Sequence, residues 1–250
     1  MFNQPPSDPN RFEGTPEGST PLPGAWTSGA STARPVAVPR EGFLTMSFVW
    51  MFLALLVSAI TASMTLANQT ALQAVVNNFL LLVLAELGMV IVLSAAINRI
   101  NATVAVALLF VYAALTGATF SVIFLAYTLP SVATAFLGAS GIFGAAALYG
   151  AVTGRDLTHL GGFLFVGLIG VIVASVANLW VGGGTLGFVI GIVGVVVFTG
   201  LTAYDVQRIR NGQMRWVQSR EQASVVGALA LYLDFINLFL MLLRVFGQRR

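Results

Sequence analysis

The sequence predicts an all-α integral membrane protein with seven transmembrane helices. Of its 250 residues, 57% are hydrophobic and only 8% are charged, and the mean hydropathy is +0.89. A soluble domain carries roughly 25% charged residues. From about residue 44 onward, apolar runs alternate with short connections, and each run approaches the ~20 residues that a helix needs to cross a bilayer. These two observations together indicate a multi-pass helical bundle.

The N-terminal segment, residues 1–41, is predicted to be a disordered tail. It contains eight of the nine prolines, together with Gly, Ser, Thr and scattered charges. Such a composition cannot bury enough apolar surface to fold. It is not a signal peptide, because no basic start leads directly into an apolar core. The predicted organisation is therefore a Pro/Gly-rich tail over 1–41 and a seven-helix transmembrane domain over 42–250.

The seven spans follow one another through short connections. Small residues recur inside them, as at Gly138, Gly141 and Gly144, and also in the fifth and sixth spans. In lipid, small residues let helix backbones approach closely, so we expect a tightly packed bundle. The expected spans are residues 44–67, 79–98, 102–128, 132–152, 160–181, 186–206 and 225–246.

The arginines predict the topology. The connections after the first, third and fifth spans contain no Arg, whereas those after the second, fourth and sixth hold Arg99, Arg155 and four further arginines. The positive-inside rule therefore places the N-terminus and these three connections in the cytoplasm. Arg249 and Arg250 disagree, because seven spans put them outside. A last segment that re-enters and returns is the alternative, but a full span is preferred because its apolar length suffices.

Residue types that are absent exclude several chemistries. The chain has no Cys, which excludes disulfides, thiolate chemistry and Cys-ligated metals. It also has no Lys, which excludes Schiff-base chemistry and therefore a retinal protein. The single His excludes a bis-His haem and weakens any zinc site. The small excess of positive charge is explained by topology better than by a nucleic-acid surface.

The tetrapeptide Gly138-Ala139-Ser140-Gly141 has the GxSG form of intramembrane serine proteases. Ser140 is expected in the outer half of its span, whereas His159 is expected in a cytoplasmic loop, on the order of 25 Å away. A general base must lie ~3 Å from its nucleophile. Helix packing is therefore the favoured role of this motif, and we do not expect an enzyme.

The last span, GALALYLDFINLFLMLLRVFG (227–247), carries an aspartate near its middle. A carboxylate at that depth costs ~2.5–3.5 kcal/mol on insertion scales. On a helical wheel, Asp234 shares one stripe with Gly227, Ala230, Asn237 and Met241. We expect this stripe to face protein or water, and the aliphatic faces to meet lipid.

A second aspartate is expected to approach the first. Asp205 closes the sixth span, and Asp234 lies roughly 13 Å down the seventh span from the same side. Two carboxylates in contact cannot both ionise cheaply and tend to share a proton, so such a pair senses pH. Two alternatives stay open: Asp205 pairs with Arg208 or Arg210 one turn on, or Asp234 is a neutral, hydrogen-bonded core acid.

Two motifs carry a resemblance to a known family. GLTAYDVQRIR (200–210) and ALALYLDFINLFLMLLRVFG (228–247) closely resemble the paired signatures of the bacterial Bax inhibitor-1 family, within the TMBIM superfamily. The segments AELGMV near Glu86 and VYAALTGATFSVIFLAYTLPSVATAF in the third span and beyond it agree with it. So does LYGAVTGRDLTHLGGFLFVGLIGVIVASVAN across the fourth and fifth spans. The resemblance covers roughly residues 44–250 and implies a fold in which six helices surround the last one.

The resemblance also implies a function. Bacterial members of this family resemble pH-sensitive calcium leak channels that use an aspartate pair as sensor, and the motifs place that pair at Asp205 and Asp234. Transient calcium binding by these two carboxylates and no resident cofactor are implied. An arginine at the end of the second span is implied to latch Asp205, and Arg99 occupies that place. Glu86 and Asn237 are candidates to line the pore.

The implied location is a bacterial inner membrane, with the lipid bilayer and calcium ions as partners and no nucleic acid. A second class of function stays open. Some bacterial relatives regulate an inner-membrane ATP-dependent protease, and the predicted tail would suit a docking segment for it. A proton-coupled transporter would use the same carboxylates, but no inverted repeat in the span pattern favours it.

Overall fold

The computed structural model describes residues 42–213, 217 and 219–249, so the tail predicted over 1–41 lies outside the described residues. The described chain folds into eight α-helices, and seven of them are long and apolar enough to cross a membrane. The predicted all-α fold with seven spans is confirmed. The helices are α1 (Phe43–Ala67), α2 (Gln69–Asn77), α3 (Phe79–Ala96), α4 (Ala102–Ala126), α5 (Leu129–Val152), α6 (Thr158–Val181), α7 (Gly184–Arg210) and α8 (Arg220–Phe246).

The two helices that carry the aspartates are longer than predicted. Helix α7 continues through the polar end of GLTAYDVQRIR, and α8 begins at Arg220, several residues before the apolar run. A capping box starts α8: Gln222 N donates to Ser219 Oγ (3.1 Å), and Ser219 N donates to Gln222 Oε1 (3.2 Å). Hydropathy marks the apolar centre of a span, whereas hydrogen bonds at the cap decide where the helix begins.

Helix α2 was predicted only as a connection. The Asn68 side chain caps it by accepting a hydrogen bond from Ala71 N (3.1 Å). Its side chains at Leu72 and Val75 are half-buried, whereas Gln73 is exposed. The helix packs against α1, α3 and α4. A short amphipathic helix between two spans is suited to the membrane–water interface.

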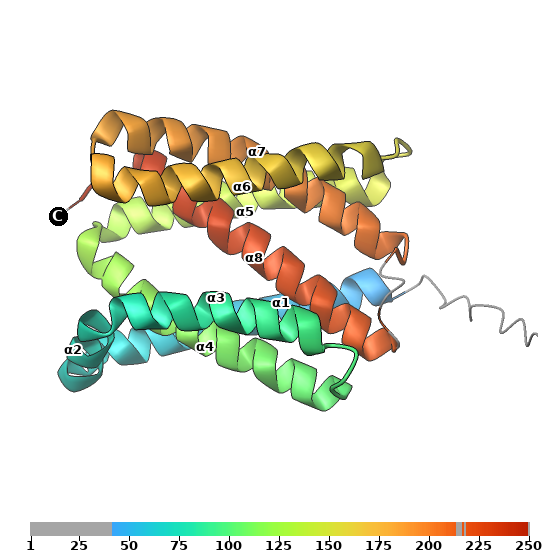
Figure 1. The fold of residues 1–250 in the computed structure, drawn as a ribbon, viewed down its shortest axis with the longest axis horizontal. Helices are drawn as coiled ribbons and strands as arrows, with labels where there is room; N and C mark the ends of the chain where they lie inside the picture. Colours follow the sequence, from blue (N-terminus) through green and yellow to red (C-terminus); the bar gives the residue numbers. More distant parts are fainter. Residues whose placement is uncertain (1–41, 214–216, 218, 250) are drawn as a thin grey trace, which may run out of the picture. The chain divides into compact units, whose positions relative to one another are not determined.

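Helix α8 lies between two groups of helices. Figure 1 shows α1, α3 and α4 on one side of it and α5, α6 and α7 on the other. It packs directly against α1, α4, α5 and α7, while α3 packs mainly on α4 and α6 mainly on α7. Within the spanning windows, 72% of α8 is buried and only 6% of α3. Helix α8 is thus the core of the described bundle, and its encirclement by six helices stays a prediction.

The aliphatic faces of α8 do not meet lipid, contrary to the helical-wheel expectation. Leu231, Leu238 and Leu243 are fully buried against neighbouring helices. The expectation was wrong because a helix that is apolar on most faces can be buried on all of them. The spans that are most exposed to lipid are instead α3 and α6, the least buried of the seven.

The end of α8 shows that it is a full span and does not re-enter. Thr128 N donates to Gln248 O (3.0 Å), and Gln248 N donates to Ser131 Oγ (3.0 Å). An isolated antiparallel bridge joins Tyr127 and Arg249. These contacts fix the C-terminal end at the α4–α5 connection. The α3–α4, α5–α6 and α7–α8 connections lie at the opposite end (Figure 1).

Two helix crossings depend on glycine. A Cβ at Gly150 on α5 would overlap the backbone of Ala203 on α7, and a Cβ at Gly117 on α4 would overlap the backbone of Ser58 on α1. By contrast, a Cβ at Gly141 or Gly144 would meet only open space. The expected role of small residues in close packing is therefore right for the bundle but wrong at these two positions, which lie on the outward face of α5.

The α5–α6 connection is tied to the end of α7. Leu157 N donates to Gln207 Oε1 (2.8 Å), and Gln207 Nε2 donates to Arg155 O (2.7 Å). Arg210 donates to the Ala151 carbonyl oxygen in the last turn of α5 and to Thr153 O (3.4 Å) at the start of this connection. The polar end of the GLTAYDVQRIR motif thus holds a loop in place, which fixes the register of α7 and with it the position of Asp205.

We expect Gln207→Leu to lower the stability of the folded protein by about 1–3 kcal/mol, because it leaves the Leu157 amide and the Arg155 carbonyl without partners. Gln207 is buried, whereas Gln213 is exposed a short distance beyond it. The measurement is thermal unfolding in detergent, with Gln213→Leu as the matched control. Equal unfolding temperatures for the two variants would contradict the prediction.

Candidate functional site

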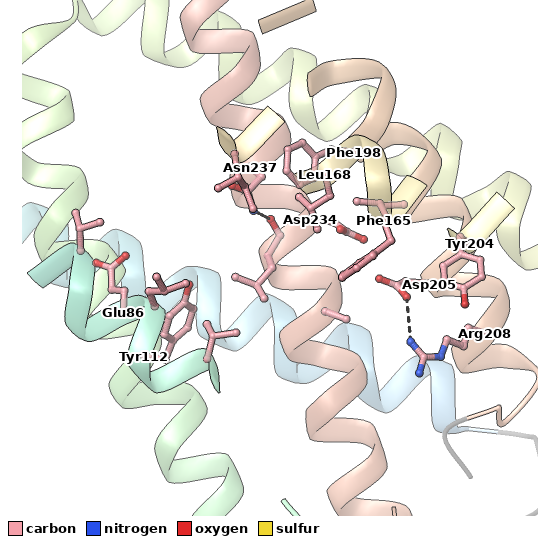
Figure 2. A pocket seen from close by; sticks show the side chains of 18 residues that line it. Glu86, Tyr112, Phe165, Leu168, Phe198, Tyr204, Asp205, Arg208, Asp234 and Asn237 are labelled. Atoms are coloured by element: carbon pink, nitrogen blue, oxygen red, sulfur yellow. Dashed lines mark hydrogen bonds and ion pairs between the residues drawn. The ribbon is translucent and has the colours of Figure 1, made fainter. Parts of the chain in front are cut away.

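A cavity of about 690 Å³ is lined by five helices of the bundle (Figure 2). Most lining side chains are apolar, and a small number of polar groups lie among them. The helices α3 and α4 contribute Glu86 and Tyr112, α7 contributes Tyr204, Asp205 and Arg208, and α8 contributes Ala230, Leu233, Asp234 and Asn237. Acidic residues from three membrane-spanning helices, α3, α7 and α8, therefore share one cavity.

Asp234 is the most deeply buried acid of the cavity. Only 5% of it is exposed, and its Oδ2 atom has no hydrogen-bond partner. A buried polar atom without a partner is costly, so this oxygen calls for an explanation. Ala230 and Asn237, from the predicted polar stripe, line the same cavity. The Asn237 amide donates to Leu233 O (2.8 Å) on its own helix and makes no hydrogen bond to Asp234 Oδ2.

Asp205 lies on the α7 side of the same cavity. Its carboxylate is 15% exposed and forms an ion pair with Arg208, with 3.9 Å between Oδ1 and Nη1. The Arg208 side chain is 33% exposed, so solvent weakens this long pair. Figure 2 shows Asp205 and Asp234 facing the cavity from α7 and α8. Both residues line this cavity, but no hydrogen bond joins the two carboxyl groups.

The predicted latch is absent from this conformation. Arg99 is exposed in the turn after α3 and does not line the cavity. Among the described residues, the ion pair of Asp205 is with Arg208 and not with Arg99. The reason is the placement of α3, which packs on α4 and not on α7. Gln222 at the start of α8 holds the α3–α4 turn by donating to Ile100 O (2.5 Å).

Glu86 lies on the far side of the cavity from Asp205. Thr119 on α4 donates to Glu86 Oε1 (2.5 Å), which supplies the partner that the sequence did not reveal. Figure 2 shows Glu86 and Tyr112 together on one side, with Asp205 and Arg208 on the other. The structure therefore brings Asp205, Asp234 and Glu86 to one cavity but places Arg99 outside it.

A polar network behind the cavity escaped the sequence analysis. Ser58 Oγ donates to Ala113 O (2.7 Å) and lies 2.7 Å from the Tyr232 hydroxyl. The rings of Tyr232 and Tyr112 meet edge to face, with centroids 5.7 Å apart. The available signal was a tyrosine in the middle of each of two spans, because a buried tyrosine hydroxyl needs a partner. The network joins α1, α4 and α8 directly behind the acidic cavity.

No resident metal site is evident in the part of the chain that the structure describes. There, no three His, Asp or Glu side chains are grouped so as to hold an ion. Calcium takes six to eight oxygen ligands at ~2.3–2.6 Å in its sites. The carboxylates of the cavity would instead favour cations electrostatically, without fixing one in place.

Ser140 and His159 show no sign of acting together. Ser140 is exposed on α5 and donates to Phe136 O (2.8 Å) within its own helix. His159 lies in the first turn of α6, and not in a loop as expected. Just before it, Thr158 N donates to Asp156 Oδ1 (2.9 Å), and hydrogen bonding from Thr158 lowers the pKa of the exposed Asp156.

The comparisons with known proteins agree with this architecture. A family model described as "Inhibitor of apoptosis-promoting Bax1" matches residues 40–250. The inner membrane protein YbhL of Escherichia coli is 43% identical over 225 residues, which cover 86% of this chain and 96% of YbhL. An uncharacterized protein of Borreliella burgdorferi is 44% identical over 217 residues, covering 84% of this chain and 94% of that protein. One from Deinococcus radiodurans is 42% identical over 209 residues, covering 83% and 90%.

Proposed function

Since the chain belongs to the Bax inhibitor-1 family, we propose that it is a pH-sensitive calcium leak channel gated by Asp205 and Asp234. The observation that carries the proposal is the buried Asp234 carboxyl, whose Oδ2 has no partner on a cavity shared with Asp205. Ionisable residues within spans are costly and mark ion or proton pathways. The inner membrane is the proposed location, in keeping with the printed name of YbhL.

The proposed orientation has the N-terminus in the cytoplasm. The connections that carry Arg99 and Arg155 lie at one end of the bundle, together with the end of α7 that carries Arg210 (Figure 1). The positive-inside rule assigns that end to the cytoplasm. Asp205 and Arg208 are close to it, so the aspartate pair would respond to cytoplasmic pH.

In the proposed mechanism, the two carboxyl groups share a proton and control the cytoplasmic end. With the pair deprotonated, Arg99 moves in to form an ion pair with Asp205 and holds α3 against α7. Acid neutralises the pair and releases Arg99, after which calcium passes along the carboxylates. Arg208 cannot replace Arg99 as the latch, because it lies on the same helix as Asp205 and joins no two helices. The described conformation then corresponds to the unlatched state.

The latch can be tested by comparing two arginine variants in calcium-loaded liposomes. We expect Arg99→Gln to raise calcium flux at mildly alkaline pH to nearly its acid level, because no other residue closes the cytoplasmic end. Arg208→Gln should keep closure and move the pH of half-maximal flux upward by only about half a unit, as the loss of an exposed pair predicts. Closure that survives Arg99→Gln but is lost in Arg208→Gln would contradict the assignment.

The primary test of the channel is calcium flux into liposomes containing the full chain, from acid to mildly alkaline pH. We expect flux that rises in acid, and no flux at any pH from folded protein would overturn the proposal. The alternative, a regulator of a membrane ATP-dependent protease, depends on the tail over 1–41, which lies outside the described residues. No observation in the described residues favours it over the channel.

A further inference from the structure

The acidic cavity opens sideways between α3 and α6. Apart from Glu86, the residues that line it on these two helices are apolar. Four of them are exposed, including Leu87 at 59% and Phe165 at 60%. The two helices are not packed against each other, and α8 is visible between them in Figure 1. Both are membrane spans, so side chains exposed on their outer surfaces meet lipid. The cavity therefore has a lipid-facing entrance.

The inner wall of the same cavity is acidic. Its charged residues are three acids, Glu86, Asp205 and Asp234, and one cation, Arg208. Glu86 accepts a hydrogen bond from Thr119, and Asp205 forms an ion pair with Arg208. Asp234 Oδ2, by contrast, is buried and has no partner. An apolar entrance thus leads to a wall that contains the Asp234 carboxyl, whose Oδ2 is closed off from the cavity and has no hydrogen-bond partner. The titratable groups that face the cavity are Glu86, Tyr112, Tyr204, Asp205, Arg208 and Asp234.

We propose that this cavity binds amphiphilic primary amines that enter from the bilayer. The ammonium group pairs with the Asp234 carboxyl, which lines the cavity, and the alkyl chain lies between Leu87 and Phe165 toward the lipid. Charge complementarity favours this occupant, because the excess of carboxylates repels fatty acids and the phosphate groups of phospholipids. A charge-assisted hydrogen bond also makes the site selective for a cationic head group, because a neutral alcohol cannot form such a bond.

The volume of the cavity agrees with such a ligand. About 690 Å³ lies within the ~300–1,000 Å³ range of small-molecule sites, which are mostly apolar with a few convergent polar groups. The amine site would be the same cavity as in the proposed channel, but the inference does not require calcium to pass through it. Direct binding therefore tests it separately from conduction.

The experiment uses the full chain in lipid nanodiscs at neutral pH with a dodecylamine that carries a diazirine on its alkyl chain. After irradiation, the labelled peptides are identified by mass spectrometry. We expect label on the cavity-lining segments of α3 and α6, and we expect unlabelled dodecylamine to compete with it. Dodecanol and dodecanoate, which have the same chain without a cationic head, should not compete.

Two variants decide the site. Asp234→Asn should lower labelling about tenfold, because it removes the charge that the ammonium pairs with. Val83→Trp places a bulky side chain at the entrance on α3, where Val83 is exposed, and should also lower labelling, even if Asp234→Asn fails to fold. Glu221→Gln removes an exposed acid of α8 outside the cavity and should leave labelling unchanged.

Three results would overturn the inference. They are label spread evenly over the lipid-facing helices, equal competition by dodecanol, and unchanged labelling in a folded Val83→Trp or Asp234→Asn variant. Calcium flux without specific labelling would remove this inference and leave the channel standing. Specific labelling without flux would support the amine site and count against the channel.

Discussion

Asp234→Asn is expected to abolish the pH dependence of calcium flux. Asn has nearly the size and shape of Asp, so the packing of α8 is kept, but its amide takes up no proton in this pH range. Asp205 then has no partner with which to share a proton and stays beside Arg208. A gate that responds to one proton changes by at most about tenfold per pH unit. We expect the wild-type flux to approach that slope and the variant profile to be flat within about twofold.

The measurement is calcium uptake into liposomes from acid to mildly alkaline pH. Wild-type and variant proteins are purified by gel filtration and reconstituted in equal amounts. Glu221→Gln is the control, because Glu221 is an exposed acid on the same helix and lies outside the cavity. Its pH profile should match the wild type. A profile for Asp234→Asn with the midpoint and amplitude of the wild type would remove Asp234 from the sensor.

Gly150→Leu is expected to prevent folding of most of the protein. Even a Cβ at this position would overlap the backbone of Ala203, and a backbone cannot rotate away as a side chain can. Overpacking in a core costs about 1–3 kcal/mol when side chains can adjust, so we expect more than about 3 kcal/mol here. Ala203 is two residues from Asp205 on α7, so any shift that relieves the overlap also moves the aspartate.

Gly141→Leu provides the control on the same helix. A Cβ there meets open space on the outward face of α5, and Leu has a better helix propensity than Gly. We expect Gly141→Leu to give wild-type yields of monodisperse protein in detergent and an unchanged or slightly raised unfolding temperature. Comparable behaviour of the two variants would show that α5 and α7 do not cross as closely as described.

Most of the fold was accessible from the sequence, because lipid imposes one strong rule. A segment that crosses the bilayer must form all of its backbone hydrogen bonds internally and must be apolar over a fixed length. The first, second, third, fourth and fifth expected spans accordingly end within a few residues of α1, α3, α4, α5 and α6. Helix α2 was missed because it is too short and too polar to show in a hydropathy pattern.

The candidate site was accessible only in part. Acids within spans, such as Asp205, Asp234 and Glu86, stand out because a charge inside a span is rare and costly. Their hydrogen-bond partners do not stand out. Thr119, the partner of Glu86, is a small polar residue of a kind that many membrane helices contain. The direction in which α3 leaves the bundle depends on the sum of many weak contacts. These contacts together decide whether Arg99 reaches Asp205, and no sequence motif reveals them.

The burial of α8 has a consequence for how the protein is made. The helix at the core of the described bundle is also the last of the seven spans to leave the ribosome, at about 5–20 residues per second. Until it emerges, α7 lacks its main packing partner, and α1 lacks the one that ranks second after α4. A nascent chain must therefore wait in the membrane as a loose set of helices. A polypeptide that ends before residue 220 lacks the helix at the core, and membrane quality control should degrade it. The loss of an early helix such as α3 would do far less harm to the packing of the interior.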